Sequence, residues 1–254
     1  MPGRRWRTVT ILTLLLTATL VVAGCSAEPA VRVLFVGNSY TFSNDLPGMV
    51  RDLAGAANRR VDTGLMAPGG WWWRDHAASK KTLNAIAEGD WDFVVLQEQS
   101  MVPALPDMAR QVSRPAAVNL AVAAIENGAR PVLFLTWGHR DGNTEVNHAG
   151  YPSMQVAIAN TYSEIGAAVA GEIAPVGMAW WMAREERPDI NLYQPDGSHP
   201  SRDGSYLAAV VITATILNVG PNELDRSLGL SSETAAALRG FAARAVAGEV
   251  PWRR

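Results

Sequence analysis

The stretch that decides the fold of this chain reads Val31-Arg32-Val33-Leu34-Phe35-Val36-Gly37-Asn38-Ser39-Tyr40. Its first six residues are mostly β-branched or aromatic and stop at a glycine, which is typical of a buried parallel strand. Gly37 and Asn38 allow a sharp turn, so that Ser39 emerges at the carboxyl end of the strand. In open α/β sheets this is the edge at which ligands and chemistry collect. Taken alone, the same three residues also fit an ordinary turn.

The composition is that of a globular protein with one core. At 254 residues, 48% of them hydrophobic, the chain is long enough for one sizeable domain or at most two. Its formal net charge of -2 gives no electrostatic reason to expect a nucleic-acid partner. The single cysteine excludes an intrachain disulfide or a thiolate metal cluster, and no motif implies a cofactor.

The amino terminus has the pattern of a secretory signal. Three arginines precede an apolar run over residues 9–24, too short to span a bilayer comfortably. The run ends in Val22-Ala23-Gly24-Cys25, which resembles the signal of bacterial lipoproteins. This resemblance implies acylation of Cys25 and a domain anchored to the membrane outside the cytoplasm. The alternative is plain cleavage near the same small residues, with Cys25 incidental.

Strand and helix patterns alternate along the rest of the chain. A signal peptide over residues 1–24 and a tether over 25–30 precede a predicted domain over residues 31–254. The predicted strands cover residues 31–36, 60–66, 92–97, 131–136 and 172–176. The predicted helices cover residues 46–57, 75–88, 106–127, 151–170, 178–186, 202–218 and 231–247. The alternation predicts a three-layer α/β/α domain with a parallel sheet of about five strands. Analogy with flavodoxin-like folds adds the strand order 2-1-3-4-5, which periodicity does not reveal.

A second motif lies near the carboxyl end, in Tyr193-Gln194-Pro195-Asp196-Gly197-Ser198-His199-Pro200. A separation of three residues in a turn lets the Asp196 carboxylate accept the Nδ1 hydrogen of His199. Nε2 is then free to accept a proton from a nucleophile such as Ser39. The alternative is a capping turn before the next helix, with His199 at the surface. The sequence distance from Ser39 is no objection, because catalytic triads are assembled in space.

With both motifs in hand, the chain resembles the SGNH (GDSL-type) hydrolases over roughly residues 31–217. The matching blocks are Gly37-Asn38-Ser39, Gly69-Gly70 and Asp196-x-x-His199-Pro200. The chain is most similar to a bacterial subgroup of unknown function in that superfamily. The resemblance implies Ser39 as nucleophile, His199 as general base and Asp196 as its orienting partner. It also implies that the backbone N–H groups of Ser39 and Gly70 form part of an oxyanion hole.

Two blocks depart from the family pattern. Asn38 stands where the family usually has aspartate, which changes the turn but removes no triad member. The third block normally supplies an oxyanion-hole asparagine, whereas here the strand ends in Gln97-Glu98-Gln99. Some SGNH esterases that act on sugars are similar in having glutamine there. We therefore expect Gln97, or else Gln99 on the same face by alternation, to donate its amide hydrogens. The alternative is that both glutamines bond only to the backbone.

Tryptophans suggest the kind of substrate. Trp71, Trp72 and Trp73 directly follow the glycine block, and Trp72 and Trp73 are expected to offer flat faces to sugar rings. The alternative is that they plug the sheet edge; a second group, Trp137, Trp180 and Trp181, is expected to extend the same rim. The favoured function is a serine esterase or deacetylase that removes short acyl groups from a carbohydrate. The alternative from another class is a non-catalytic, lipid-anchored glycan-binding protein on the same scaffold.

The remaining histidines carry weaker hypotheses. His139, Asp141 and His148 share one polar loop, but their spacing fits no helix-borne metal pair, so a metal site is not expected. His76 is expected on a helix surface or lining the site.

Overall fold

The computed structural model of the chain describes residues 29–253. The predicted signal peptide and Cys25 lie outside this range. Within it, no helix combines the length and the apolar character that crossing a membrane requires.

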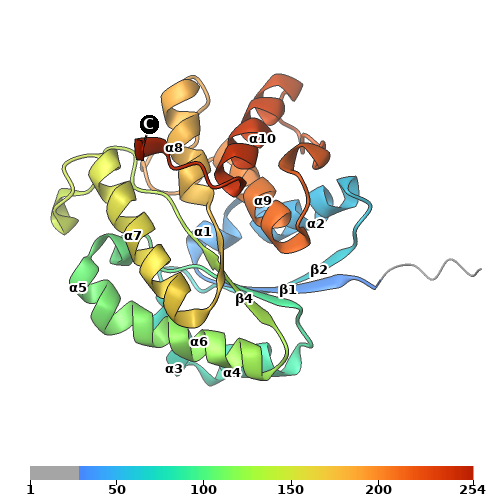
Figure 1. Cartoon of the computed structure of the whole chain (residues 1–254), viewed down its shortest axis with the longest axis vertical. Helices are drawn as coiled ribbons and strands as arrows, with labels where there is room; N and C mark the ends of the chain where they lie inside the picture. The colour runs from blue at the N-terminus through green and yellow to red at the C-terminus, as the bar shows by residue number, and fades with distance from the viewer. Residues whose placement is uncertain (1–28, 254) are drawn as a thin grey trace, which may run out of the picture.

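A five-stranded parallel sheet forms the centre of the domain (Figure 1). The strands run in the order β2-β1-β3-β4-β5, which confirms the predicted fold class and order. Their bounds are β1 Val31–Val36, β2 Val61–Met66, β3 Phe93–Leu96, β4 Arg130–Phe134 and β5 Glu172–Ala174. Residues 33–36 of β1 are almost completely buried, because helices cover both faces of the sheet.

The register of the central strands sets the position of the site. Val36, the last residue of β1, pairs with Met66 of β2 and with Leu96 of β3. The three strands therefore end level with one another. The segments that follow them, which carry the serine, glycine and glutamine blocks, meet at the same edge of the sheet.

Helices form the two outer layers (Figure 1). α2 and α9 pack together on one face with α8 and α10 around them, whereas α3, α4 and α7 pack around α6 on the other. The bounds of the longer helices are α2 Leu46–Ala56, α4 Lys80–Glu88, α6 Arg114–Glu126, α7 Tyr151–Val169, α8 Val176–Glu186, α9 Arg202–Leu217 and α10 Ser232–Val246. The short ones are α1 Ser39–Phe42, α3 Trp73–Ala78 and α5 Pro106–Met108.

Three local features differ from the sequence expectation. The helix predicted over residues 75–88 divides at Ser79, whose extended backbone ends α3 and whose side chain caps α4. Asp75 lies inside α3 rather than at its start, and accepts the N–H of Trp72. The helix predicted over 106–127 contains a π-helical segment, Ala109–Ser113, between α5 and α6.

Candidate active site

Ser39 owes its position to the turn that follows β1. The side chain of Asn38 accepts the N–H of Tyr40 at 3.1 Å and caps α1, so the helix begins at Ser39. The Asn38 amide also donates to the carbonyl of Trp71 at 2.9 Å, which fastens this turn to the loop after β2. Asparagine, where the family usually has aspartate, thus supplies both a cap and a link between two blocks.

The Asp196–His199 turn is rigid in its own right. Gln194 donates its N–H to the carbonyl of His199 at 2.8 Å, and Gly197 adopts the left-handed conformation that favours glycine. One oxygen of Asp196 accepts the N–H groups of Ser198 and His199, both at 2.9 Å. The other oxygen lies 2.6 Å from His199 Nδ1. This is the contact that the three-residue spacing predicts.

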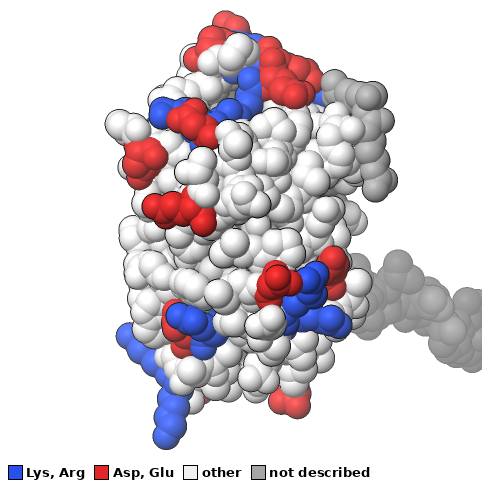
Figure 2. Space-filling model, turned by 90° about the vertical axis from the view of Figure 1, so that its left-hand side faces the viewer, with Lys and Arg blue, Asp and Glu red and all other residues white. Residues whose placement is uncertain are grey.

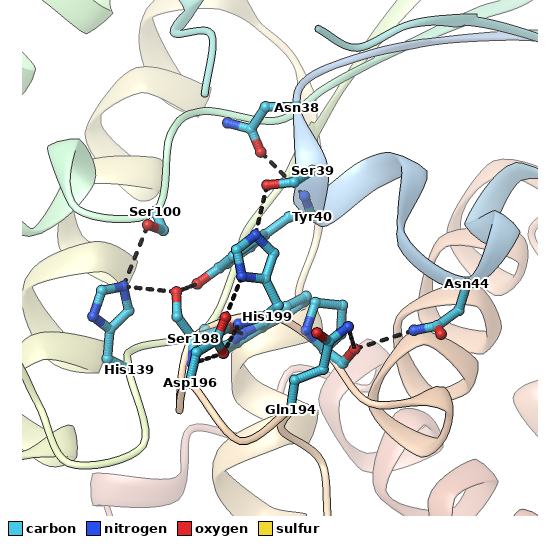
Figure 3. A network of polar contacts seen from close by, with 12 residues as sticks. Asn38, Ser39, Tyr40, Asn44, Ser100, His139, Gln194, Asp196, Ser198 and His199 are labelled. Carbon is cyan, nitrogen blue, oxygen red and sulfur yellow. Dashed lines mark hydrogen bonds and ion pairs between the residues drawn. The ribbon is translucent and has the colours of Figure 1, made fainter. Parts of the chain in front are cut away.

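The structure brings this turn to Ser39. His199 Nε2 lies 2.8 Å from Ser39 Oγ, although the two residues are 160 positions apart (Figure 3). Partial burial acts to raise the pKa of Asp196, but the N–H groups of Ser198 and His199 and the His199 ring together lower it below its ordinary value. An ionised Asp196 holds the proton on Nδ1, so Nε2 is the basic nitrogen that faces the Ser39 hydroxyl. The arrangement can therefore take a proton from Ser39 and return it to another oxygen.

Asn44 holds the two halves of this site together. Its side chain donates to the carbonyls of Pro200 and Ser201 at 3.1 and 3.0 Å and to Ser205 Oγ at 2.9 Å. Asn44 itself has a positive φ of 56°, a conformation that asparagine tolerates better than most residues. The segment after α1 is thus tied directly to the residues that follow His199.

Stacked aromatic rings support the site from inside. Tyr40 stacks on Trp137 at 4.7 Å, and Trp137 stacks on Trp180 at 3.8 Å. Trp137 and Trp180 are fully buried, and Trp181 is nearly so. The expectation that these tryptophans extend a binding rim is therefore wrong: their rings belong to the core beneath Ser39.

A pocket of about 360 Å³ opens over Ser39. Its lining consists of residues 38–40, Gly70, residues 99–100 and residues 198–199. Gly70 has a φ of 74°, which a side chain would strain. Within the described residues, the backbone N–H groups of Ser39 and Gly70 have no hydrogen-bond acceptor.

Gln97 does not reach this pocket, which corrects the sequence expectation. The side chain is completely buried, and its oxygen accepts the N–H of Asn38 at 2.9 Å and the hydroxyl of Thr41 at 2.8 Å. Its NH2 group donates to the carbonyl of Glu98. The oxygen of Gln97 and one hydrogen of its NH2 group are therefore engaged inside the protein, and the side chain does not line the pocket over Ser39.

Gln99 does line the pocket. Its amide oxygen accepts the N–H groups of Met101 and Val102 at 2.7 and 3.2 Å. Because only oxygen can accept these bonds, the NH2 group is the opposite end of the amide. No acceptor is found for it within residues 29–253.

The tryptophans after the glycine block differ in exposure: Trp73 is buried, whereas Trp71 and Trp72 are partly exposed. Trp73 is completely buried and packs edge-on against Tyr162, so it is a core residue and not the predicted substrate contact. Trp72 is half-buried beneath the guanidinium of Arg74, 4.0 Å from its ring centre. Neither residue lines the pocket over Ser39.

The other histidines take internal roles. His76, expected at a surface or in the site, is completely buried; it donates from Nε2 to the Gly37 carbonyl at 2.8 Å. Burial lowers its pKa, so the ring is neutral. His148 bonds to the Ala104 carbonyl at 2.8 Å, whereas His139 points to Ser100 and Ser198. Within residues 29–253 no three His, Cys, Asp or Glu side chains gather as metal ligands.

The fold and site together define a class: a three-layer α/β protein with a Ser-His-Asp constellation at the carboxyl edge of its sheet. A structure from Slackia heliotrinireducens, assigned to the SGNH hydrolases, is 32% identical and has a TM-score of 0.63. It matches 74% of this chain and 100% of its own length. The chain belongs to the SGNH (GDSL-type) hydrolase family.

More distant structures share the fold. A DUF4886 family protein from Bacteroides uniformis is 18% identical, with a TM-score of 0.73 over 87% of this chain and 97% of its own. An acetyl-xylooligosaccharide esterase from Geobacillus stearmophilus is 14% identical, with a TM-score of 0.54 over 76% of this chain and 95% of its own. A scan of family models and a search of curated proteins both found no match.

Glu98 stands between the two glutamines, and no pattern in the sequence assigns it a role. It is 1% exposed, and one carboxylate oxygen accepts the N–H groups of Trp73 at 2.9 Å and Gln99 at 2.8 Å. Burial raises the pKa of this carboxyl to about 7, against the smaller opposing effects of the Ser113 hydroxyl and of the two N–H groups. Glu98 therefore fastens the start of α3 to the segment that carries Gln99.

The raised pKa of Glu98 predicts how the stability of the folded protein depends on pH. Glu98 keeps its proton in the folded protein at pH values where the unfolded chain has lost it, so stability falls as the pH rises from about 4.5 to about 7. From pH 5 to pH 8 the expected loss from this group is about 2–3 kcal/mol. Glu98→Gln should remove that part of the pH dependence, as measured by urea unfolding of both proteins at several pH values. Parallel curves for the two proteins would show that Glu98 is not protonated in the fold.

Proposed function

We propose that this chain is a serine esterase that removes a short acyl group from a carbohydrate or a similar hydroxylated alcohol outside the cytoplasm. The observation that carries this proposal is the 2.8 Å contact between Ser39 Oγ and His199 Nε2, with Asp196 bonded to the far side of the imidazole. Membership of the SGNH hydrolase family supports the same reaction class.

The reaction begins when Ser39 Oγ bonds to the carbonyl carbon of the ester. Its proton passes to His199 Nε2, and the carbonyl electrons move onto oxygen. The tetrahedral intermediate collapses by breaking the bond to the alcohol oxygen, which takes the proton from His199. The products of this half are a free alcohol and an acyl group on Ser39. Water then adds with His199 as base, and the acid departs as Ser39 recovers its proton.

Asp196 stabilises the step at which the imidazole becomes positively charged. Its lowered pKa keeps it ionised, and its second oxygen is occupied by two backbone N–H groups. The carboxylate is therefore held in one orientation and stays ionised when His199 gains its proton.

Three donors surround the place where the oxyanion forms. They are the N–H groups of Ser39 and Gly70 and the NH2 group of Gln99, all from residues that line the same pocket. Gln99 takes the position that we expected for Gln97. Its amide oxygen is fixed by two backbone N–H groups, so the donor is preorganised before substrate binds.

Two further observations support a short acyl group and a sugar-like alcohol. The pocket, at about 360 Å³, is small, and its lining residues are polar apart from Gly70. The acetyl-xylooligosaccharide esterase described above shares the fold. The same proposal includes attachment of the protein to the membrane through a lipid on Cys25. A secreted esterase that is anchored there would meet polysaccharide at the cell surface.

The first prediction from this proposed function concerns Ser39. Ser39→Ala should lower kcat/KM for 4-nitrophenyl acetate at least about 1000-fold, since the nucleophile is lost. A fluorophosphonate probe should label the wild-type protein and not the variant. Ser43→Ala is the matched control, because this nearby hydroxyl has no hydrogen-bond partner among residues 29–253 and lies outside the pocket. Turnover by Ser39→Ala within tenfold of wild type would remove Ser39 from the mechanism, and a wild type that resists the probe would favour a non-catalytic glycan-binding protein.

The second prediction separates the two glutamines. Gln99→Ala should lower kcat on the order of 100-fold through loss of an oxyanion donor. Gln97→Ala should instead lower the free energy of unfolding by about 2–4 kcal/mol, because it leaves the Asn38 N–H and the Glu98 carbonyl buried without partners. Steady-state kinetics and urea unfolding of both variants test this. The opposite pattern, with Gln97 affecting only turnover, would restore the original assignment.

The third prediction concerns anchoring. When the full chain is expressed in bacteria fed radiolabelled palmitate, the label should appear on the wild-type protein and be absent from Cys25→Ser. The variant should also leave the membrane fraction. An unlabelled wild-type protein would exclude the lipid anchor and leave the esterase proposal untouched.

A further inference from the structure

A second polar cluster lies beside Ser39 and takes no part in the proton path to Asp196. Tyr40 Oη lies 2.6 Å from Ser198 Oγ, and His139 Nε2 lies 3.1 Å from that same oxygen (Figure 3). His139 Nε2 is also 3.3 Å from Ser100 Oγ. The four residues come from α1, the segment after β3, the segment after β4 and the Asp196–His199 turn. The fold thus gathers three hydroxyl groups around one imidazole.

The tautomer of His139 follows from its neighbour Asn143. The side-chain oxygen of Asn143 accepts the N–H of Glu145 at 2.8 Å, so its NH2 group is the end that faces His139 Nδ1, at 3.5 Å. An NH2 group only donates, so Nδ1 accepts. Burial lowers the pKa of His139 and keeps the ring neutral. The ring hydrogen therefore sits on Nε2 and is shared by the oxygens of Ser198 and Ser100.

The donor hydrogens of this cluster outnumber those that its internal hydrogen bonds use. One imidazole hydrogen serves both serine oxygens, and the contact between Tyr40 and Ser198 uses one hydroxyl hydrogen. Tyr40 also interacts with the Ser100 hydroxyl, so at least one of the three hydroxyl hydrogens remains. All three hydroxyl residues line the pocket over Ser39, so a group bound there can accept the remaining hydrogen.

The residues that line the pocket indicate which kind of acceptor group it can bind. It contains no Lys, Arg, Asp or Glu, so a charged group would enter without a compensating partner. It also contains no aliphatic side chain, so a fatty chain would gain little of the roughly 0.8 kcal/mol that each buried methylene can contribute. Figure 2 shows the face of the molecule toward which the strands run. On this face most of the Lys, Arg, Asp and Glu side chains lie away from the middle. The acceptor that fits is a neutral oxygen.

We propose that Tyr40, Ser100 and Ser198 form a hydroxyl-binding subsite, oriented by His139, for a neutral hydroxyl group on the alcohol part of the ester. Ser198 adjoins His199, which protonates the departing oxygen, so the alcohol part is the one that lies beside this cluster. His139 is a positioning residue: it fixes the two serine oxygens and touches no reacting atom. The inference rests on the proposed esterase function and specifies its substrate as the ester of a polyol or sugar.

The test compares two acetates with rings of the same size. One is a mono-O-acetylated methyl xylopyranoside, which has free hydroxyl groups beside the ester; the other is cyclohexyl acetate, which has none. The quantity measured is the ratio of kcat/KM for the xyloside to kcat/KM for cyclohexyl acetate, by acetate release. The wild-type protein should favour the xyloside. The double variant Ser100→Ala, Ser198→Ala should lower the ratio roughly 30-fold, as expected for two neutral hydrogen bonds.

Matched variants separate binding from folding. Ser163→Ala removes an exposed hydroxyl on α7 and should leave the ratio as in wild type. His139→Ala should lower the ratio, and His139→Gln, which keeps an N–H donor, should recover part of it. Thermal melting of each variant identifies any loss that comes from unfolding, and a variant that melts below the assay temperature is replaced by the single Ser198→Ala change.

The outcomes are distinct. A wild-type ratio near one, or a ratio that the double variant leaves unchanged, overturns the subsite while the esterase function stands. If the wild-type protein hydrolyses neither acetate and Ser39 resists the fluorophosphonate probe, the proposed function itself fails and the subsite fails with it.

Discussion

The hydrogen bond between Ser39 Oγ and His199 Nε2 joins the end of the first strand to a turn 160 residues later. The two atoms lie 2.8 Å apart, and neighbouring side chains support this arrangement. Asn44 ties the segment after α1 to the residues after His199, and Tyr40 packs edge-on against the His199 ring. Tyr40, Trp137 and Trp180 form a stack of rings that supports the pair from the core. Two segments that are distant along the chain are thus held together by side chains that flank the reacting groups.

The end of β3 shows how polar groups inside the protein position those that face the pocket. Gln97 and Glu98 are almost completely buried, and between them they accept N–H groups from three different segments: the turn after β1, the start of α3 and the segment after β3. Gln99, one residue further on, points outward. The serine, glycine and glutamine blocks therefore share an internal hydrogen-bond network, and the oxyanion site depends on side chains that never contact substrate.

Apart from Gly70, the residues that line the pocket over Ser39 have polar side chains. Its side chains offer hydroxyl, imidazole and amide groups at short range, and Trp73, Trp137 and Trp180 are buried in the core. Tyr40 belongs to both regions: its ring stacks on Trp137, and its hydroxyl bonds to Ser198. The same residue therefore packs the core and supplies a polar group to the pocket.

The sequence alone determined the alternation of strands and helices, the strand that ends at Ser39 and the turn that joins Asp196 to His199. Each depends on residues close together in the chain, whose spacing fixes backbone geometry directly. Local sequence could not decide whether Gln97 or Gln99 lines the pocket. Alternation places both on one face only while the strand continues, and β3 ends at Leu96.

Tertiary structure also decided which indole is buried and what surrounds the pocket. Trp73 is a core residue because α3 begins there and brings its ring against Tyr162 of α7. His139 contacts Ser100, 39 residues away in the sequence, and Ser198, 59 residues away. No local sequence pattern predicts these contacts. Packing between distant segments selects one of several orientations that the local sequence allows, so these contacts became visible only in the folded protein.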